Sequence, residues 1–154
     1  MTRFFYGLQP RWLSWDRLYR VYVCDRMLAG AYVAGQFYDE PSAAIQLQLL
    51  GLFLRPLVRR WLAQRQEREA MYDVADPFDP SLLNYDRRNF QVPRSEVTRT
   101  RFRRNRSLWT AFNVGVVELE LVDSTRMRFL LVGDQQPDEV LDLMREFDPD
   151  IEVS

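Results

Sequence analysis

The side chains that could do chemistry in this chain are carboxylates, hydroxyls, arginines and one thiol, because the sequence contains neither histidine nor lysine. Histidine is the commonest general acid, general base and metal ligand, and lysine is the residue that forms Schiff bases. All 21 basic side chains are arginine, whose guanidinium stays protonated at any ordinary pH. The composition therefore predicts a non-catalytic protein without a cofactor.

Carboxylates occur in two patterns that resemble catalytic or metal sites. Glu118 and Glu120 would share one face of a strand, but arginines on neighbouring strands would keep both ionised, which suits ion pairs better than acid–base catalysis. Asp73, Asp76 and Asp79 resemble a calcium loop, but they are three residues apart where the calcium-binding pattern requires two. We therefore predict no catalytic residue and no metal site.

The single cysteine, Cys24, follows an apolar stretch and has no histidine to activate it, so we predict a buried structural thiol. One cysteine cannot form an internal disulfide, and the first residues lack a signal-peptide pattern. No apolar run is long enough to span a bilayer. The sequence therefore predicts a cytoplasmic protein.

The candidate binding site is the connection 103–113 between two expected strands, which is too long for a tight turn. It combines arginines with large apolar side chains, the types enriched at interface hot spots: Arg103, Arg104, Arg106, Leu108, Trp109 and Phe112. Trp109 and Phe112 could instead fold down over the end of the sheet. The same residues could also stack on bases and contact phosphate, although a net charge of -1 argues against nucleic acid.

Basic and acidic residues are concentrated in two separate segments of the sequence. Residues 87–106 contain eight arginines and one acid, Glu96, and residues 134–152 contain eight acids and one base, Arg145. The two blocks could neutralise each other within the fold or lie separately in solvent.

The length of 154 residues and the hydrophobic content of 47% predict a single domain over 1–154. Residues 1–16 are aromatic and are expected to be irregular. Leu18–Cys24 and Met27–Ala34 predict a β-hairpin with a turn at Asp25-Arg26. Gly30 and Gly35 indicate a kink or a close backbone approach in the second strand.

Residues 41–72 change to a helical period and predict a helical insertion, either one kinked helix or two. Its apolar stripe consists of Leu47, Leu50, Leu54, Leu57, Trp61 and Leu62. The stripe could pack on the sheet, or it could lie in a membrane interface or a partner's groove. Residues 73–89 contain Asp-Pro twice and predict a loop.

Three alternating segments predict antiparallel strands: Val97–Arg104, Val116–Val122 and Arg126–Val132. The first places Arg99, Arg101 and Arg103 opposite Thr98, Thr100 and Phe102. A three-residue loop at 123–125 would set Glu120 against Arg128 and keep one face apolar, whereas a two-residue loop would mix the faces. The outer face is then predicted to be an arginine–glutamate–arginine ladder. A C-terminal helix beginning at Pro137 would bury Val140, Leu141, Met144 and Phe147.

The order of these elements resembles bacterial pleckstrin-homology-like (GRAM-related) domains, whose barrel is closed by a C-terminal helix. Three segments carry the resemblance: 19–28 (YRVYVCDRML), 90–97 (FQVPRSEV) and 115–147 from GVVELEL onwards. The helical insertion departs from the family, and the lysine-rich first loop of its phosphoinositide-binding members is reduced here to Asp25-Arg26.

The predicted fold class is α+β, with a PH-like antiparallel barrel or bent sheet. The resemblance implies a binding or scaffolding module acting through protein–protein contacts in a bacterial cytoplasm, with homo-oligomers possible. The alternative is a peripheral module at an anionic membrane surface, followed by a nucleic-acid-binding protein.

Overall fold

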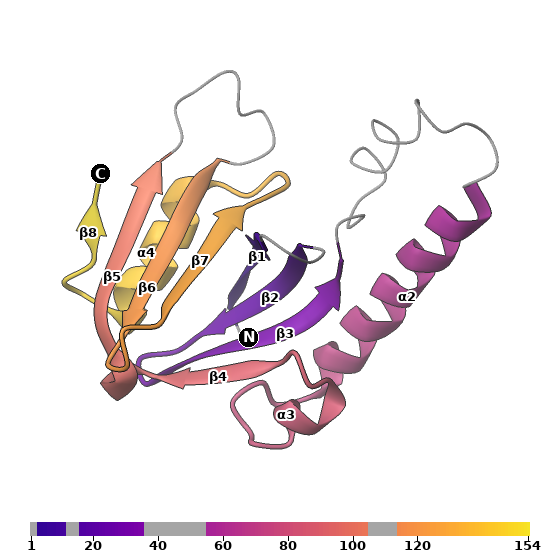
Figure 1. Cartoon of the computed structure of the whole chain (residues 1–154), viewed down its shortest axis with the longest axis horizontal. Helices are drawn as coiled ribbons and strands as arrows, with labels where there is room; N and C mark the ends of the chain where they lie inside the picture. The colour runs from indigo at the N-terminus through magenta and orange to yellow at the C-terminus, as the bar shows by residue number, and fades with distance from the viewer. Residues whose placement is uncertain (1–2, 12–15, 36–54, 105–113) are drawn as a thin grey trace.

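The computed structural model describes residues 3–11, 16–35, 55–104 and 114–154 (Figure 1). Its strands are β1 (Phe4–Gln9), β2 (Arg17–Val23), β3 (Met27–Ala34), β4 (Phe90–Pro93), β5 (Val97–Arg104), β6 (Gly115–Leu121), β7 (Arg126–Leu131) and β8 (Glu152–Val153). Its helices are α2 (Arg55–Val74), α3 (Leu82–Tyr85), the 3-10 turn η2 (Arg94–Glu96) and α4 (Pro137–Phe147). The strands form one mixed sheet in the order β4-β3-β2-β1-β7-β6-β5-β8, and β8 pairs with β5 in parallel. The predicted α+β class is confirmed.

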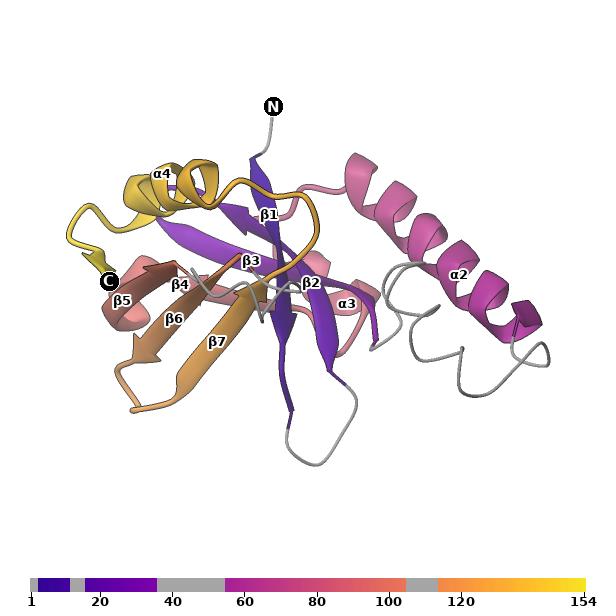
Figure 2. The same ribbon diagram turned by 90° about the horizontal axis from the view of Figure 1, so that it is seen from above.

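The sheet bends so that β5–β7 cross β2 and β3 obliquely, with α4 against one side and α2 alongside β3 (Figures 1 and 2). One half of the bent sheet consists of β1–β4 and the other of β5–β8. The main core lies between these two halves and α4. It includes Tyr19, Val21, Phe102, Val117, Leu119, Phe129, Met144 and Phe147. A second core lies on the other side of β1–β3, and includes Leu18, Tyr22, Ala29, Val33, Tyr72 and Leu82. Within the described part of the chain, strands β1–β3 are therefore the ones buried on both faces of the sheet.

The hairpin of β2 and β3 confirms the predicted turn at Asp25-Arg26, where the Cys24 amide donates to the Met27 carbonyl at 3.0 Å. Gly30 is a place of close approach, though by a side chain and not by the backbone: a Cβ atom there would lie 2.1 Å from the Phe90 ring. At Gly35 the nearest atom, the Tyr32 hydroxyl oxygen, would be 3.6 Å away. The Phe90 ring stacks on Phe129 of the opposite half of the sheet, at 5.8 Å between centroids. Gly30 therefore lets an aromatic ring connect the two halves.

The prediction that residues 1–16 are irregular is wrong over Phe4–Gln9. These residues form β1, which pairs with β2 and joins the two halves of the sheet by pairing with β7. Phe5 contacts the main core, while Tyr6 and Leu8 pack on the second core. Because both faces of β1 are covered, its sequence lacks the alternation of apolar and polar residues by which a strand is recognised. At Gly7 a Cβ atom would lie 2.9 Å from the Phe129 Cβ, so a side chain would displace β7.

The helical insertion is described over α2 only, and residues 36–54 lie outside the described part. The predicted stripe is only partly buried where it is described: Leu57 is 42% exposed and Trp61 and Leu62 are half-buried, whereas Val58 and Tyr72, outside the stripe, are buried. The end of α2 packs on the second core through Met71 and Tyr72, and polar contacts also join the helix to the sheet, such as Arg68 Nη1 donating to the Val33 carbonyl at 3.3 Å. An apolar pattern cannot predict these polar contacts.

The segment 73–89 is less irregular than predicted, because α2 continues to Val74 and α3 forms within it. Its end is fixed by the buried Asn89 side chain. Asn89 Oδ1 accepts hydrogen bonds from the Tyr32 amide at 2.8 Å and the Tyr72 hydroxyl at 3.2 Å, and Nδ2 donates to the Leu82 carbonyl at 2.8 Å. One amide thereby joins β3, α2 and α3.

The β6–β7 hairpin has the predicted loop length but a different register. The loop is Val122-Asp123-Ser124, closed by the Leu121 amide donating to the Thr125 carbonyl at 2.9 Å, so Glu120 lies opposite Arg126 and not Arg128. The last loop residue must adopt a left-handed conformation. Ser124 does so with φ of 66°, whereas a loop at 123–125 would have placed the β-branched Thr125 there. The register moves by two residues, so the apolar and charged faces stay as predicted.

Two further expectations concern β5 and α4. Thr98 was expected beside Thr100 and Phe102, but a bulge between Val97 and Arg99 leaves it exposed, with its hydroxyl donating to the Glu120 carbonyl at 2.9 Å. The predicted C-terminal helix is confirmed: Pro137 lies in its first turn, and Val140, Leu141, Met144 and Phe147 are buried.

Candidate functional site

The outer faces of β5, β6 and β7 present a charged surface that no described helix covers (Figure 1). Alternation along the strands turns Phe102, Val117 and Phe129 into the core and the charged residues outward. We call this surface the arginine face, and define it as Arg99, Arg101, Arg103, Glu118, Glu120, Arg126, Arg128 and, from β8, Glu152. The predicted arginine–glutamate–arginine ladder is therefore present.

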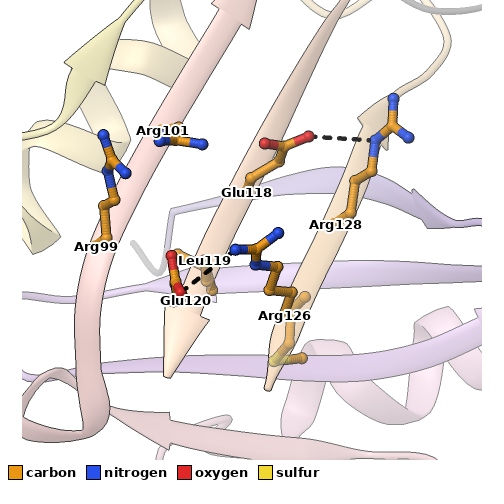
Figure 3. Close-up of a pocket in the computed structure, with 8 residues that line it drawn as sticks. Arg99, Arg101, Glu118, Leu119, Glu120, Arg126 and Arg128 are labelled. Carbon is orange, nitrogen blue, oxygen red and sulfur yellow. Dashed lines mark ion pairs between the residues drawn. The ribbon is translucent and has the colours of Figure 1, made fainter. Parts of the chain in front are cut away.

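Glutamates of the central strand lie between two rows of arginines (Figure 3). Glu118 Oε1 is 3.5 Å from Arg128 Nε and 3.8 Å from Arg103 Nη2. Glu120 Oε1 is 3.6 Å from Arg126 Nη2. These distances are longer than a normal hydrogen bond, so the guanidinium groups are held by charge attraction and stay partly solvated.

Glu152 is the third acid of the arginine face, and β8 brings it there. Arg99 donates to it from Nε at 2.6 Å and from Nη2 at 2.7 Å, and Arg101 Nε donates at 3.1 Å. The hydrogen bonds from Arg99, and then those from Arg101, lower the pKa of Glu152, and the same contact raises the pKa of Arg99. Glu152 was not among the predicted residues, because a parallel strand of two residues is too short to give an alternating pattern.

The arginine face has five arginines and three glutamates, an excess of positive charge. Arg99 and Arg101 use their Nε atoms on Glu152, whereas Arg103, Arg126 and Arg128 make only longer ion pairs among the described residues. The side chain of Arg126 is 77% exposed. Guanidinium donors with this freedom can bind a carboxylate or a phosphate through charge-assisted hydrogen bonds.

The arginine face is hollowed in two adjoining places. One depression of about 140 Å³ lies over β5, β6 and β7, among the residues shown in Figure 3. A second of about 320 Å³ is lined by residues of β5, β6 and the chain end at Val153 and Ser154. Arg101 and Glu118 line both, so the two depressions adjoin at these side chains.

The residues predicted as a binding site are only partly within the described chain. Arg103 lies on the arginine face, whereas Arg104 forms an ion pair with Asp138 of α4. The others, Arg106, Leu108, Trp109 and Phe112, lie outside the described residues. The structure therefore places Arg103 and Arg104 on opposite sides of β5.

The two charge blocks partly neutralise each other, one of the two alternatives left open by the sequence. Besides the pairs made by Arg104 and Glu152, Arg94 Nη2 donates to the buried Asp148 at 2.8 Å. Arg94 Nε also donates to the Phe147 carbonyl at 3.1 Å, so this arginine secures the end of α4. Arginines of the first block thus help to position the helix that closes the main core.

The other candidate reactive groups make structural contacts. Asp73 pairs with Arg20, and Asp76 and Asp79 accept hydrogen bonds from the backbone amides two residues later, at 3.0 and 2.8 Å. No group of three or more potential metal ligands occurs among the described residues. Cys24 is half-buried, not buried as predicted, because it lies just beyond β2 in the turn, where Sγ is 3.5 Å from the Met27 carbonyl.

None of the helices in the described part of the chain is long and apolar enough to cross a bilayer. Comparisons of the chain with models of protein families, with curated proteins and with solved structures returned no match.

Proposed function

We propose that this chain is a non-catalytic binding module that contacts a partner protein through the arginine face and the adjoining connection 103–113. The observation that carries the proposal is the unequal covering of the sheet. The outer side of β1–β3 is packed under α2 and α3, whereas no described element covers the charged side of β5–β7. Arginine is among the residues enriched at protein interfaces.

The state of the titratable groups supports binding over catalysis. Asp86 and Glu152 both have a lowered pKa, and in each case the first cause is a hydrogen bond from an arginine. Burial raises the pKa of Tyr19, Tyr22 and Tyr72, which keeps these phenols neutral. Such shifts suit permanent ion pairs and packed phenols, whereas acid–base catalysis needs a group that changes protonation near the working pH.

The resemblance to PH-like domains and the cytoplasmic location belong to the same proposal. A bent sheet that is antiparallel except at β8, with a C-terminal helix against its core, supports the resemblance.

Affinity capture tests the proposal. The chain is immobilised and exposed to an extract of its native host, and bound proteins are identified by mass spectrometry. Arg126→Gln/Arg128→Gln removes two charges from the arginine face, and Arg59→Gln/Arg60→Gln removes two from exposed positions of α2 as a matched control. We expect the first variant to lose a specific partner and the second to keep it. Identical capture by both would reject the arginine face.

Trp109→Ala tests the connection separately. As an interface anchor, its loss should abolish capture and leave the melting temperature nearly unchanged. A destabilised variant that still captures its partner would show that Trp109 is structural and would remove the connection from the proposed site.

The membrane alternative is tested by sedimentation with anionic lipid vesicles. Binding to an anionic surface through arginines weakens steeply with ionic strength. Salt-sensitive sedimentation of the wild-type chain, lost in Arg126→Gln/Arg128→Gln, would favour the membrane over a protein partner.

A further inference from the structure

We propose that the arginine face binds an extended acidic peptide segment whose carboxylates recur at every second residue. This inference rests on the proposed function and names the chemical class of its partner.

The spacing of the arginines gives the period of the ligand. Arg99, Arg101 and Arg103 lie two residues apart on β5, and Arg126 and Arg128 are two apart on β7. Two residues of strand advance about 6.6–6.8 Å. An extended peptide has the same repeat, so side chains on one of its faces meet successive guanidinium groups in register. A helical peptide, which rises about 5.4 Å per turn, does not match it.

The central glutamates restrict where an acidic ligand can lie. Glu118 and Glu120 separate the two arginine rows, so a continuous line of negative charge over β6 is repelled. In a peptide whose acidic residues alternate with neutral ones, every carboxylate can point toward a row of arginines while the neutral side chains point the other way. The arrangement thus favours alternating acids over a uniform polyanion.

The two arginines of β7 provide hydrogen-bond donors for such a ligand. Arg126 and Arg128 make ion pairs of 3.6 and 3.5 Å with the central glutamates, and their side chains are 77% and 50% exposed. Each guanidinium has five N–H donors and can receive a carboxylate in a fork. A bound peptide can therefore add hydrogen bonds without first breaking a close internal one.

The shape of the surface supports a peptide rather than a flat domain. Along β5, one depression is lined by Arg99 and Arg101 and the other by Arg101 and Arg103. An extended chain that lies along the strands can therefore occupy both, whereas a flat surface would bridge them.

The test uses two fluorescent peptides of identical composition. In one, glutamate alternates with threonine; in the other, all glutamates precede all threonines. Fluorescence anisotropy measures binding to the full chain. We expect the alternating peptide to bind at least about tenfold more tightly, a difference of about 1.4 kcal/mol.

Charge reversal locates the site. Arg126→Glu/Arg128→Glu should weaken the alternating peptide by more than about tenfold, and the matched control Arg59→Glu/Arg60→Glu, on the exposed side of α2, should change it less than about twofold. Circular dichroism melting verifies that both variants fold. If charge reversal prevents folding, Arg126→Gln/Arg128→Gln replaces it and is expected to show the same ranking.

Each contrary outcome rejects a specific part of the proposal. Equal binding of both peptides rejects the period of two, and equal loss in face and control variants rejects the arginine face. Tighter binding of single-stranded DNA or anionic vesicles, with the same variant sensitivity, rejects a peptide ligand. If neither peptide binds but Arg126→Gln/Arg128→Gln still loses the captured partner, this inference fails and the proposed function stands. If that variant also keeps the partner, both fail.

Discussion

Arg20 on β2 donates a hydrogen bond of 2.5 Å from Nη1 to Asp73 Oδ1 near the end of α2, across the interface between sheet and helix. Only 6% of the arginine side chain is exposed, whereas 64% of the Asp73 side chain is. The guanidinium also lies 4.6 Å from the centre of the Phe4 ring and donates from Nη2 to the Tyr6 hydroxyl at 3.3 Å. A buried charge therefore holds one end of α2 on the sheet.

The first prediction concerns this contact. Asp73→Asn should lower the free energy of unfolding by about 1–2 kcal/mol, because it removes the closest anion from a buried guanidinium. Glu67→Gln makes the same change of charge at an exposed position of α2 and should cost less than about 0.5 kcal/mol. Urea denaturation measures both. Equal effects would mean that the contact does not stabilise α2.

The second prediction concerns the close approach at Gly30. Gly30→Ala should destabilise the protein by about 1–3 kcal/mol, because a Cβ atom at that position lies 2.1 Å from the Phe90 ring. The displaced ring would also lose its stacking on Phe129. Thermal unfolding gives the change in stability.

A double-mutant cycle separates this clash from loss of glycine's backbone freedom. Phe90→Leu removes the ring atoms that clash, so Gly30→Ala should cost less in that background than in the wild-type chain. The same cost in both backgrounds would show that Phe90 is not the obstacle.

The third prediction compares neighbours on β6. Leu119 is 1% exposed and belongs to the main core, so Leu119→Ala should cost about 2–5 kcal/mol. Glu118 faces outward between Arg103 and Arg128, and Glu118→Ala should cost only a few tenths of a kcal/mol, about the worth of a surface ion pair. Chemical denaturation of the two variants tests the assignment of faces, which similar losses would contradict.

The fourth prediction is a dependence on pH. Arg88 donates to Asp86 from Nε at 2.7 Å and from Nη2 at 2.6 Å, and these bonds lower the pKa of Asp86. A carboxylate with a lowered folded-state pKa stabilises the protein above its unfolded pKa, about 3.9. This contribution is lost as the pH falls below that value and through the lower folded pKa.

The variant Asp86→Asn isolates this contribution. Its unfolding free energy should be lower than wild type by about 1–3 kcal/mol at neutral pH, and the difference should shrink as the pH falls below about 4. Asp25→Asn, whose side chain in the wild type is 76% exposed, serves as the control and should show little difference at any pH. A gap between wild type and Asp86→Asn that stays constant into strong acid would contradict the role of Arg88.

Strands and helices with one solvent-exposed face and one buried face were predictable from the sequence. In β5, β6 and β7, apolar and charged residues alternate because one face packs in the main core and the other lies in water. The same reasoning predicted the buried positions of α4. Alternate residues of a strand share a face, so the arginines and glutamates of β5–β7 could be assigned to one face before their geometry was known.

Pairing register was not predictable to the residue. A shift of two residues between β6 and β7 preserves both faces, and the hydrophobic pattern cannot distinguish Arg126 from Arg128 as the partner of Glu120. The choice depends on which residue can adopt the left-handed position of the turn, and Ser124 meets that condition better than Thr125.

The residue pattern was enough to predict an α+β chain, the β2–β3 hairpin, the C-terminal helix and an outward stripe of arginines. Three features became apparent only in the folded chain: Phe4–Gln9 joins the two halves of the sheet, Arg20 helps to hold α2, and β8 brings Glu152 to the arginines. The difference lies in the range of the interactions. Alternation and helical period record burial within one element, whereas these three contacts join residues more than fifty positions apart and depend on how the whole sheet bends.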